Sequence, residues 1–484
     1  MRGHETFWKP SAMPRTSRLT AVSLLCMALA GLALGGSARA ADPAPVRLRV
    51  VGMSDLKSKT SPCGCSTPKG GFARMATYLD SLRLGRDPVV FVDGGGSFPD
   101  VVGRPDLPPF VMRSLVAMGV DAVGIGPRDL QFGLAYLLTE ARRSGAPWTC
   151  ANLVERATGK PVLPPSRIVE RGGVKVGLFA LIGDRLDLGP ARDSLQVLDP
   201  ENTAQRIVAD LRGRGAQVIV MLGYLGRVGT EDIAAAVPGI DVGIVGHEAP
   251  YFPNGRPVGD GVLSYAGEQG QHLGVAEVEL DADGRVTARS AEVRTLGPDV
   301  RTQPAMAEQV RAFEDTYNER MRLEQRRMQA LADADPDQDP VDHYVGGEVC
   351  ARCHAPEAAQ WRTTAHSVAW ETLVRERKDA TPECIPCHSV GYGEAGGFRD
   401  AMRTPHLVNV QCENCHGMGT LHDRQGAERT PVGEATCKRC HNAERDPAFD
   451  YAARIQEVVH SNTSGVSLRN IEARRRGGAY GVGH

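Results

Sequence analysis

Four short stretches near the end of the chain repeat one pattern of two cysteines and a histidine. They read CARCH (350–354), CIPCH (384–388), CENCH (412–416) and CKRCH (437–441). Two thiols three positions apart can bond to the vinyl groups of a haem, and the next His can bind its iron. Paired C-x-x-C also occurs in zinc sites, but zinc spacing does not require that His. The pattern predicts four c-type haems held by these residues: Cys350, Cys353, His354, Cys384, Cys387, His388, Cys412, Cys415, His416, Cys437, Cys440 and His441.

Further histidines in the same part of the chain could bind the free face of each iron. They are His343, His366, His406, His422 and His460. Each could instead be an ordinary surface or hydrogen-bonding residue. His422 follows His416 by only six residues, so we assign it to a neighbouring haem.

Two segments, WRTTAHSVAW (361–370) after the first haem motif and VQCENCHGMGTLH (410–422) around the third, resemble the cytochrome c-554 family of tetrahaem proteins. The resemblance covers roughly residues 343–465. It implies that His366, His422 and His460 are distal ligands, each to a haem packed nearby. In that family the second haem, here that of His388, tends to lack a distal ligand. His343 or His406 could fill this position, and the question stays open.

The chain before residue 300 has a different pattern. Apolar runs such as RLRVVGM, PVVFVDG, VKVGLFALIG and IDVGIVG alternate with helical stretches. This alternation predicts a layered α/β domain with helices over a sheet. Functional loops in such folds follow the carboxyl ends of strands. The stretch FVDGGGSF, residues 91–98, falls at such a place.

The order of these units resembles the calcineurin-like metallophosphoesterases, especially the 5′-nucleotidase branch, over about residues 46–300. The resemblance implies a two-metal site built from D-x-H, G-D, G-N-H-E, a later His and G-H-x-H, because two-metal hydrolysis needs these ligands. The corresponding residues here are Asp55-Leu56-Lys57, Gly96, Gly126-Pro127-Arg128-Asp129, Tyr224, and His247 with Ala249. Only Asp55 and His247 clearly survive as ligands. We therefore expect a degraded metal site without conventional phosphoesterase activity.

Three cysteines outside the haem motifs fall near these loops. Cys63 and Cys65 lie in SPCGCSTPKGG, and Cys150 begins another loop in WTCANL. Together with His247 they could bind an additional metal, form a redox-active disulfide or react with a sulfur compound. The plainer alternatives are a structural disulfide or buried thiols.

The remaining segments predict export and a linker. In residues 1–40 two arginines precede an apolar run that ends in ARA, which predicts a secretory signal peptide cut after Ala40 and a periplasmic protein. An uncleaved anchor is the alternative, and no other segment could span a membrane. Residues 304–332 predict an amphipathic linker helix, packed on a domain or forming a dimer with a second copy. Residues 466–484 predict a disordered tail.

Taken together, the sequence predicts a layered α/β, metallophosphoesterase-like sandwich followed by a mostly α, haem-packed multihaem cytochrome c domain. Lys plus Arg number 56 against 58 Asp plus Glu, which gives no indication of a nucleic-acid partner. We expect an exported electron-transfer protein that meets redox partner proteins, with the phosphoesterase-like domain docking, sensing or supplying electrons. The alternatives are a haem-dependent oxidoreductase for a small nitrogen or sulfur compound, and a residual metal-dependent hydrolase.

Overall fold

The computed structural model describes residues 46–63, 67–99, 104–332, 342–425, 432–442, 445–446 and 448–460. The predicted signal peptide, Cys65 and the predicted tail all lie outside the described residues. Below, the front region is residues 46–300 and the rear region is residues 342–460.

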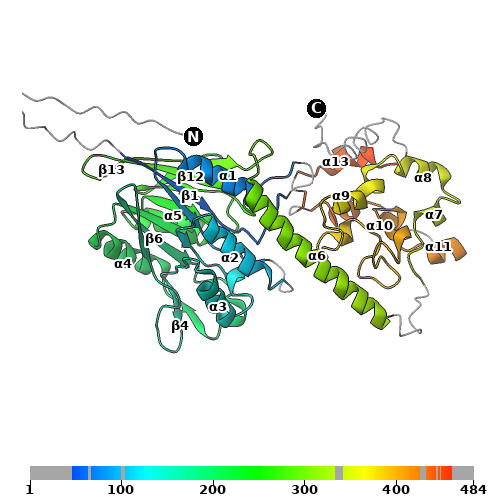
Figure 1. Ribbon diagram of the computed structural model, residues 1–484, viewed down its shortest axis with the longest axis horizontal. Helices are drawn as coiled ribbons and strands as arrows, with labels where there is room; N and C mark the ends of the chain where they lie inside the picture. The colour runs from blue at the N-terminus through cyan, green and yellow to red at the C-terminus, as the bar shows by residue number, and fades with distance from the viewer. Residues whose placement is uncertain are drawn as a thin grey trace, which may run out of the picture. The chain divides into compact units, whose positions relative to one another are not determined.

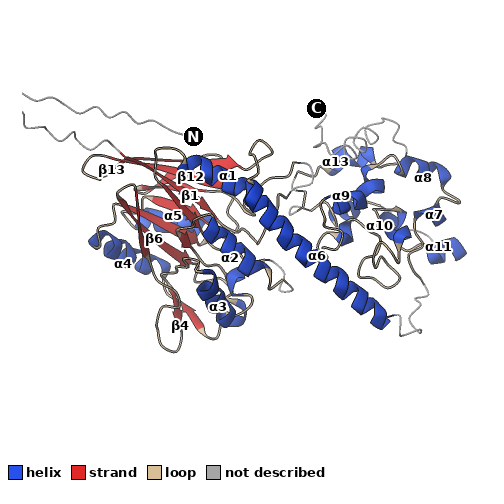
Figure 2. Ribbon diagram, viewed as in Figure 1, coloured by secondary structure: helices blue, strands red, loops and turns tan. Residues whose placement is uncertain are grey.

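Two β-sheets form the centre of the front region (Figures 1 and 2). The first has the strand order β13-β12-β1-β2-β3 and the second the order β10-β11-β9-β8-β6-β5. The first sheet contains β1 Val46–Met53, β2 Val89–Asp93, β3 Ala122–Val123, β12 His272–Leu280 and β13 Val286–Thr295. The second contains β5 Arg167–Arg171, β6 Val174–Ile182, β8 Val218–Tyr224, β9 Val242–Val245, β10 Arg256–Val258 and β11 Gly261–Ser264. A separate pair joins β4 Leu153–Glu155 to β7 Leu195–Val197.

The strands that lead into the predicted site run in parallel. β1 pairs with β2 so that Met53 lies opposite Asp93, and β8 pairs with β9 so that Gly223 lies opposite Val245. Parallel neighbours end at the same edge of a sheet, so the loops that follow them are brought together.

Three apolar clusters divide the front region into four layers, helix–sheet–sheet–helix. Successive side chains of a strand point to opposite faces. Along β1, Leu48 and Val50 therefore enter the cluster between the two sheets, while Val51 and Met53 enter the cluster under the first helical layer. That layer contains α1 Phe72–Arg83, α2 Leu107–Ala117 and α3 Leu134–Ser144. The other helical layer, α4 Pro200–Gly213 and α5 Gly226–Ala236, covers the second sheet.

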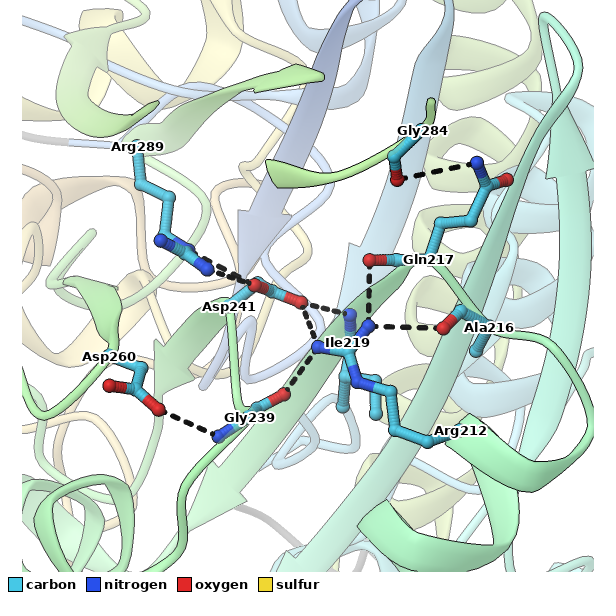
Figure 3. A network of polar contacts seen from close by, with 9 residues as sticks. All are labelled: Arg212, Ala216, Gln217, Ile219, Gly239, Asp241, Asp260, Gly284 and Arg289. Atoms are coloured by element: carbon cyan, nitrogen blue, oxygen red, sulfur yellow. Dashed lines mark hydrogen bonds and ion pairs between the residues drawn. The ribbon is translucent and has the colours of Figure 1, made fainter. Parts of the chain in front are cut away.

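A buried carboxylate ties the two sheets together away from the site loops (Figure 3). Asp241, just before β9, accepts hydrogen bonds from Arg212 of α4 at 2.8 Å, from Arg289 of β13 at 2.6 Å and from the backbone of Ile219 at 2.8 Å. Its side chain is fully buried. Because both arginines reach it, the charge is paired and hydrogen-bonded, as a buried charge must be.

The long helix α6, Pro304–Ala332, follows the front region. Its Met306 and Val310 are buried in the cluster under α1 and α2, and Phe313 stacks on Phe110 with ring centres 4.1 Å apart. The first half of the apolar stripe is therefore used within the chain. A dimer through residues 304–332 stays a prediction.

The named secondary-structure elements of the rear region are short helices and 3₁₀ turns. The α-helices are α7 Gly347–Cys350, α8 Ala355–Trp361, α9 Ala369–Arg375, α10 Cys412–His416, α11 Thr420–Gln425, α12 Glu434–Lys438 and α13 Tyr451–Arg454. The 3₁₀ turns are Ala365–Val368, Ile385–Cys387, Pro405–Leu407 and Ile455–Glu457, while the front region has Pro127–Leu130 and Gly189–Ala191. One small cluster gathers buried apolar side chains here: Trp370, Leu373, Ile385, Val390, Phe398 and Leu407. Among the described helices of the whole chain, none combines the length and apolar character needed to cross a membrane.

Candidate functional site

Asp55 lies in the loop after β1, with a positive φ of 48°. Its side chain is buried, with a residue exposure of 2%. Its Oδ1 accepts a hydrogen bond from the Tyr224 hydroxyl at 2.6 Å, and its Oδ2 accepts one from the His247 backbone N–H at 2.8 Å. Burial raises the pKa of Asp55 above its usual range, and the bond from Tyr224 opposes this shift. Both oxygens of this surviving ligand position thus bind protein donors.

The Tyr224 side chain fills the space beside Asp55. A Cβ placed on Gly96 would lie 2.7 Å from both Asp55 Oδ1 and the Tyr224 hydroxyl, and one on Gly126 would lie 2.5 Å from the tyrosine ring. Gly96 also has a φ of +72°, which side chains rarely adopt. Burial and the neighbouring carboxylate of Asp55 raise the pKa of Tyr224, so the hydroxyl is a donor. A carboxylate at position 96 could not coexist with this tyrosine.

Asp129, which is not part of the FVDGGGSF loop, binds the backbone of that loop. Its carboxylate accepts four backbone N–H groups: those of Gly126, Gly96, Ser97 and Phe98, at 2.8 to 3.0 Å. Burial raises the pKa of Asp129 to about 6, against the opposing effect of these bonds. Asp129, which stands in the loop that corresponds to G-N-H-E, therefore fixes the backbone of the FVDGGGSF loop.

Asp93, the acid of the same loop, is also directed into the protein. It accepts hydrogen bonds from the Ser97 hydroxyl and, at 3.1 Å, from the Gly95 N–H. Complete burial raises the pKa of Asp93 to about 7. Lys57, which stands at the His position of D-x-H, pairs with Glu268 at 2.6 Å.

A dinuclear metal centre does not fit these residues. In the described part of the chain, no three His, Cys, Asp or Glu side chains gather as a metal site. Such a centre requires several convergent oxygen or nitrogen ligands. Here the oxygens of Asp55 are bonded to protein donors and the tyrosine ring lies next to them.

The thiols lie in different surroundings. Cys63 donates to Gln269 Oε1 and accepts from Gln271 Nε2, each at 3.3 Å, and is partly exposed. Cys150 is completely buried in the front core beside Asn152, and burial raises its pKa to about 12. Every cysteine in the described residues is free of disulfides. Cys150 thus has the environment of an inert buried thiol.

In the rear region three pairs of imidazole rings face each other. The ring centres of His354 and His422 lie 6.2 Å apart at an interplanar angle of 24°. Those of His416 and His460 lie 6.3 Å apart at 17°. The third pair, His366 with His441, is 6.2 Å apart and more steeply crossed, at 50°.

Hydrogen bonds at Nδ1 orient two of the motif histidines, His388 and His441. His388 Nδ1 bonds to the Ala369 carbonyl at 2.6 Å. His441 Nδ1 bonds to Asp446 Oδ2 at 2.8 Å. Such partners fix the tautomer and orientation of metal-binding histidines.

The paired cysteines also approach one another across motifs. The Cys350 thiol hydrogen-bonds to the sulfur of Cys412, and the Cys440 thiol to that of Cys387. The first motif therefore neighbours the third, and the second neighbours the fourth.

The two open histidines are held by hydrogen bonds of their backbones. The His343 backbone bonds to Thr420, and its Nδ1 is buried without a hydrogen-bond partner. The backbone carbonyl of His406 accepts a bond from Gln411 at 2.7 Å. The Leu407 carbonyl, next to His406, accepts a hydrogen bond from the Val390 N–H at 2.9 Å, but no described contact joins either histidine side chain to that of His388.

Comparisons with known proteins match the front region and the rear region to different proteins. Residues 349–417 match the family model described as cytochrome c554 and c-prime. Cytochrome c-554 of Nitrosomonas europaea is 34% identical over 149 residues, which cover 27% of this chain and 63% of that protein. The chain joins a nucleotidase-like region to a cytochrome c554-like region.

The nucleotidase-like part is supported by more distant relatives. The 2′,3′-cyclic-nucleotide 2′-phosphodiesterase/3′-nucleotidase of Yersinia enterocolitica is 27% identical over 324 residues, or 55% of this chain and 48% of that protein. The structure of the sulfate thiohydrolase SoxB of Thermus thermophilus shares the fold, with a TM-score of 0.50 at 15% identity over 55% of this chain and 60% of that one. The chain spans about half the length of these nucleotidase relatives. The front region is a metallophosphoesterase-like α/β sandwich, and the rear region is mostly helical.

Several residues of these sites carry no sequence signal that would find them. Asp446, Gln269 and Gln271 match no motif, and only the folded chain brings them to His441 and Cys63. Tyr224 was identified by position as a lost ligand, but its bond to Asp55 could not be read from the sequence.

Proposed function

We propose that the protein is an exported electron-transfer protein. Its rear region would hold four covalent c-type haems through the four C-x-x-C-H motifs, and its front region would dock or sense without hydrolysing. A haem supplies a one-electron iron couple, and redox partner proteins would exchange electrons with it. The match to the cytochrome c554 model supports covalent haem, and the number of haems is part of the proposal.

The observation that carries the proposal is the spacing of the three ring pairs. A metal–imidazole bond is about 2.0–2.1 Å long and the ring centre lies ~1.1 Å beyond the nitrogen, so two imidazoles opposite each other on one metal have centres about 6.3 Å apart. The three pairs have 6.2, 6.2 and 6.3 Å. Each pair contains one motif histidine, so His422, His366 and His460 are the proposed distal ligands.

The sparse packing of the rear region agrees with this proposal. Its one described cluster, around Trp370 and Phe398, has six buried apolar side chains. Six buried apolar side chains form a small core for a segment of this size, since protein interiors are normally close-packed. Porphyrin faces would supply the missing apolar surface.

Two features support a front region that does not hydrolyse. Tyr224 occupies the space beside Asp55, and Gly96 stands where the bridging acid would be. With the tyrosine ring in this place, no space is left beside Asp55 for a further metal ligand from position 96. The nucleotidase activity named for the relatives belongs to those proteins.

The haem part is tested on the purified full-length protein. We expect an intact mass four haems above that of the polypeptide, and at least three low-spin irons in the electron paramagnetic resonance spectrum. Replacing His422 by Ala should convert one low-spin iron to high spin, whereas His272→Ala, the matched control in the front region whose ring bonds to Thr295, should not. Bare polypeptide, or equal effects of the two variants, would contradict the assignment.

The front part is tested by metal analysis and turnover. With Mn²⁺ or Zn²⁺ supplied, we expect neither stoichiometric metal beyond haem iron nor hydrolysis of nucleotides and sulfate thioesters. Metal-dependent turnover would establish a residual hydrolase instead. A high-spin iron that binds nitrite or sulfite in the unmodified protein would favour the oxidoreductase alternative.

A further inference from the structure

The fourth haem motif has a carboxylate behind its histidine. His441 Nδ1 and Asp446 Oδ2 are 2.8 Å apart, and the Asp446 side chain is only 12% exposed. Phe449 stacks on the same ring, with centres 4.5 Å apart and planes 17° from parallel. The ring is therefore held between an aromatic face and a charged acceptor, with Nε2 directed away from the carboxylate.

The other described Nδ1 bonds end on neutral oxygens. His388 bonds to the Ala369 carbonyl, and His460 bonds to the Gln360 side-chain oxygen at 3.3 Å. A carboxylate draws the Nδ1 proton toward itself and makes the imidazole a stronger donor to iron than a neutral acceptor does. A stronger donor stabilises ferric over ferrous iron, which lowers the reduction potential.

The fourth motif lies beside the second, because the Cys440 thiol hydrogen-bonds to the sulfur of Cys387. The haem of His388 is therefore the neighbour with which the haem of His441 is compared.

We propose that Asp446 is a positioning residue that sets the haem of His441 at a lower reduction potential than its neighbour at His388. This inference rests on the proposed function, since it needs haem at both motifs. The inference gives electron transfer between these two haems a direction. The iron held by His441 gives up its electron more readily than the iron held by His388.

The test is a redox titration of the full-length, haem-loaded protein followed by electron paramagnetic resonance. The His366 and His441 planes cross at 50°, against 24° and 17° for the other pairs. A larger crossing angle raises the largest g value of a low-spin iron, so this haem is recognised by its own signal. We expect that signal to titrate at a lower potential than the His388 haem, and Asp446→Asn to raise it.

Matched variants separate this effect from general electrostatics. Asp450→Asn removes the same charge four residues away, at an exposed side chain that caps α13, and Asn also caps helices. It should leave the signal unchanged. Asp446→Glu, which keeps a carboxylate, should restore most of the low potential.

The outcomes are distinct. Equal shifts in Asp446→Asn and Asp450→Asn, or no shift in Asp446→Asn, overturn the inference while the haem count leaves the proposed function intact. Should Asp446→Asn lose its fourth haem, Asp446→Ser gives a second neutral variant for the same titration, and an unchanged potential there also overturns the inference. A mass without haem contradicts the proposed function itself.

Discussion

Replacing Tyr224 by Phe removes one hydroxyl from the centre of the front region and leaves the ring in place. Asp55 Oδ1 then loses the donor that lies 2.6 Å from it, in a site where the residue is 2% exposed. A hydrogen bond to a charged group contributes about 1.5–3 kcal/mol to stability. We expect the free energy of unfolding of the front region to fall by that amount at neutral pH.

The loss should depend on pH in a defined direction. Burial already raises the pKa of Asp55, and the bond from Tyr224 opposes that rise, so the variant should have a still higher folded-state pKa. The folded variant therefore binds a proton more tightly than the folded parent, while the unfolded chains are alike. The difference in stability is then smallest near pH 4 and grows as the pH rises, because only the ionised carboxylate depends on the lost donor. Near pH 4 it should shrink to about 0.5–1.5 kcal/mol, the value for a neutral pair.

The measurement is urea unfolding read by hydrogen-exchange mass spectrometry in peptides from β1 and β8, which separates the front region from the haem-bearing one. The matched control is Tyr136→Phe, whose hydroxyl donates to the neutral Pro105 carbonyl at 2.6 Å. It should cost about 0.5–1.5 kcal/mol with no dependence on acid pH. If Tyr224→Phe gives the same loss at pH 4 and pH 7.5, or no more than the control, the role assigned to the pair is wrong.

Three further predictions follow from the buried acids. Asp129→Asn turns an amide N–H₂ toward backbone donors and should cost about 2–4 kcal/mol, with faster exchange of the Gly96 and Ser97 amides. Asp241→Asn leaves two arginines around a neutral group and should cost about 3–5 kcal/mol in urea unfolding. Because the folded-state pKa of Asp93 is raised to about 7, its contribution to stability is greatest below pH 4 and is lost as the pH rises to 7. Asp93→Asn should therefore weaken the decline of front-region stability across that window, measured by unfolding at pH 4, 5.5 and 7.

The sequence predicts the front fold well because its evidence is local. Buried strands appear as apolar runs, and the parallel order of β1 with β2 brings the loops that follow Met53 and Asp93 together. Side-chain partners are a different matter, since they join residues far apart. Nothing in the spacing shows that the hydroxyl of Tyr224 turns to Asp55, or that Asp129 clamps the glycine loop.

In the rear region the motif histidines could be named from spacing, but their partners could not. His366 follows the first motif closely, yet its ring faces that of His441 in the fourth. His422 follows the third motif and faces His354 in the first. Short helices and turns fold the segment back on itself, so proximity along the chain is a poor guide to which two rings meet.

The residues that stand at the former ligand positions of the front region, Gly96 and Tyr224, depend on one another. With a carboxylate at position 96, the Cβ alone would collide with the Tyr224 hydroxyl, so the loss of that acid and the presence of the tyrosine belong together. Asp129 holds the same glycine loop by accepting hydrogen bonds from its backbone N–H groups. Restoring a carboxylate at position 96 alone would strain the loop against Tyr224 and would not complete a metal site. This dependence supports the proposal that the front region is a scaffold joined to the cytochrome c554-like region, and not a nucleotidase that lacks one residue.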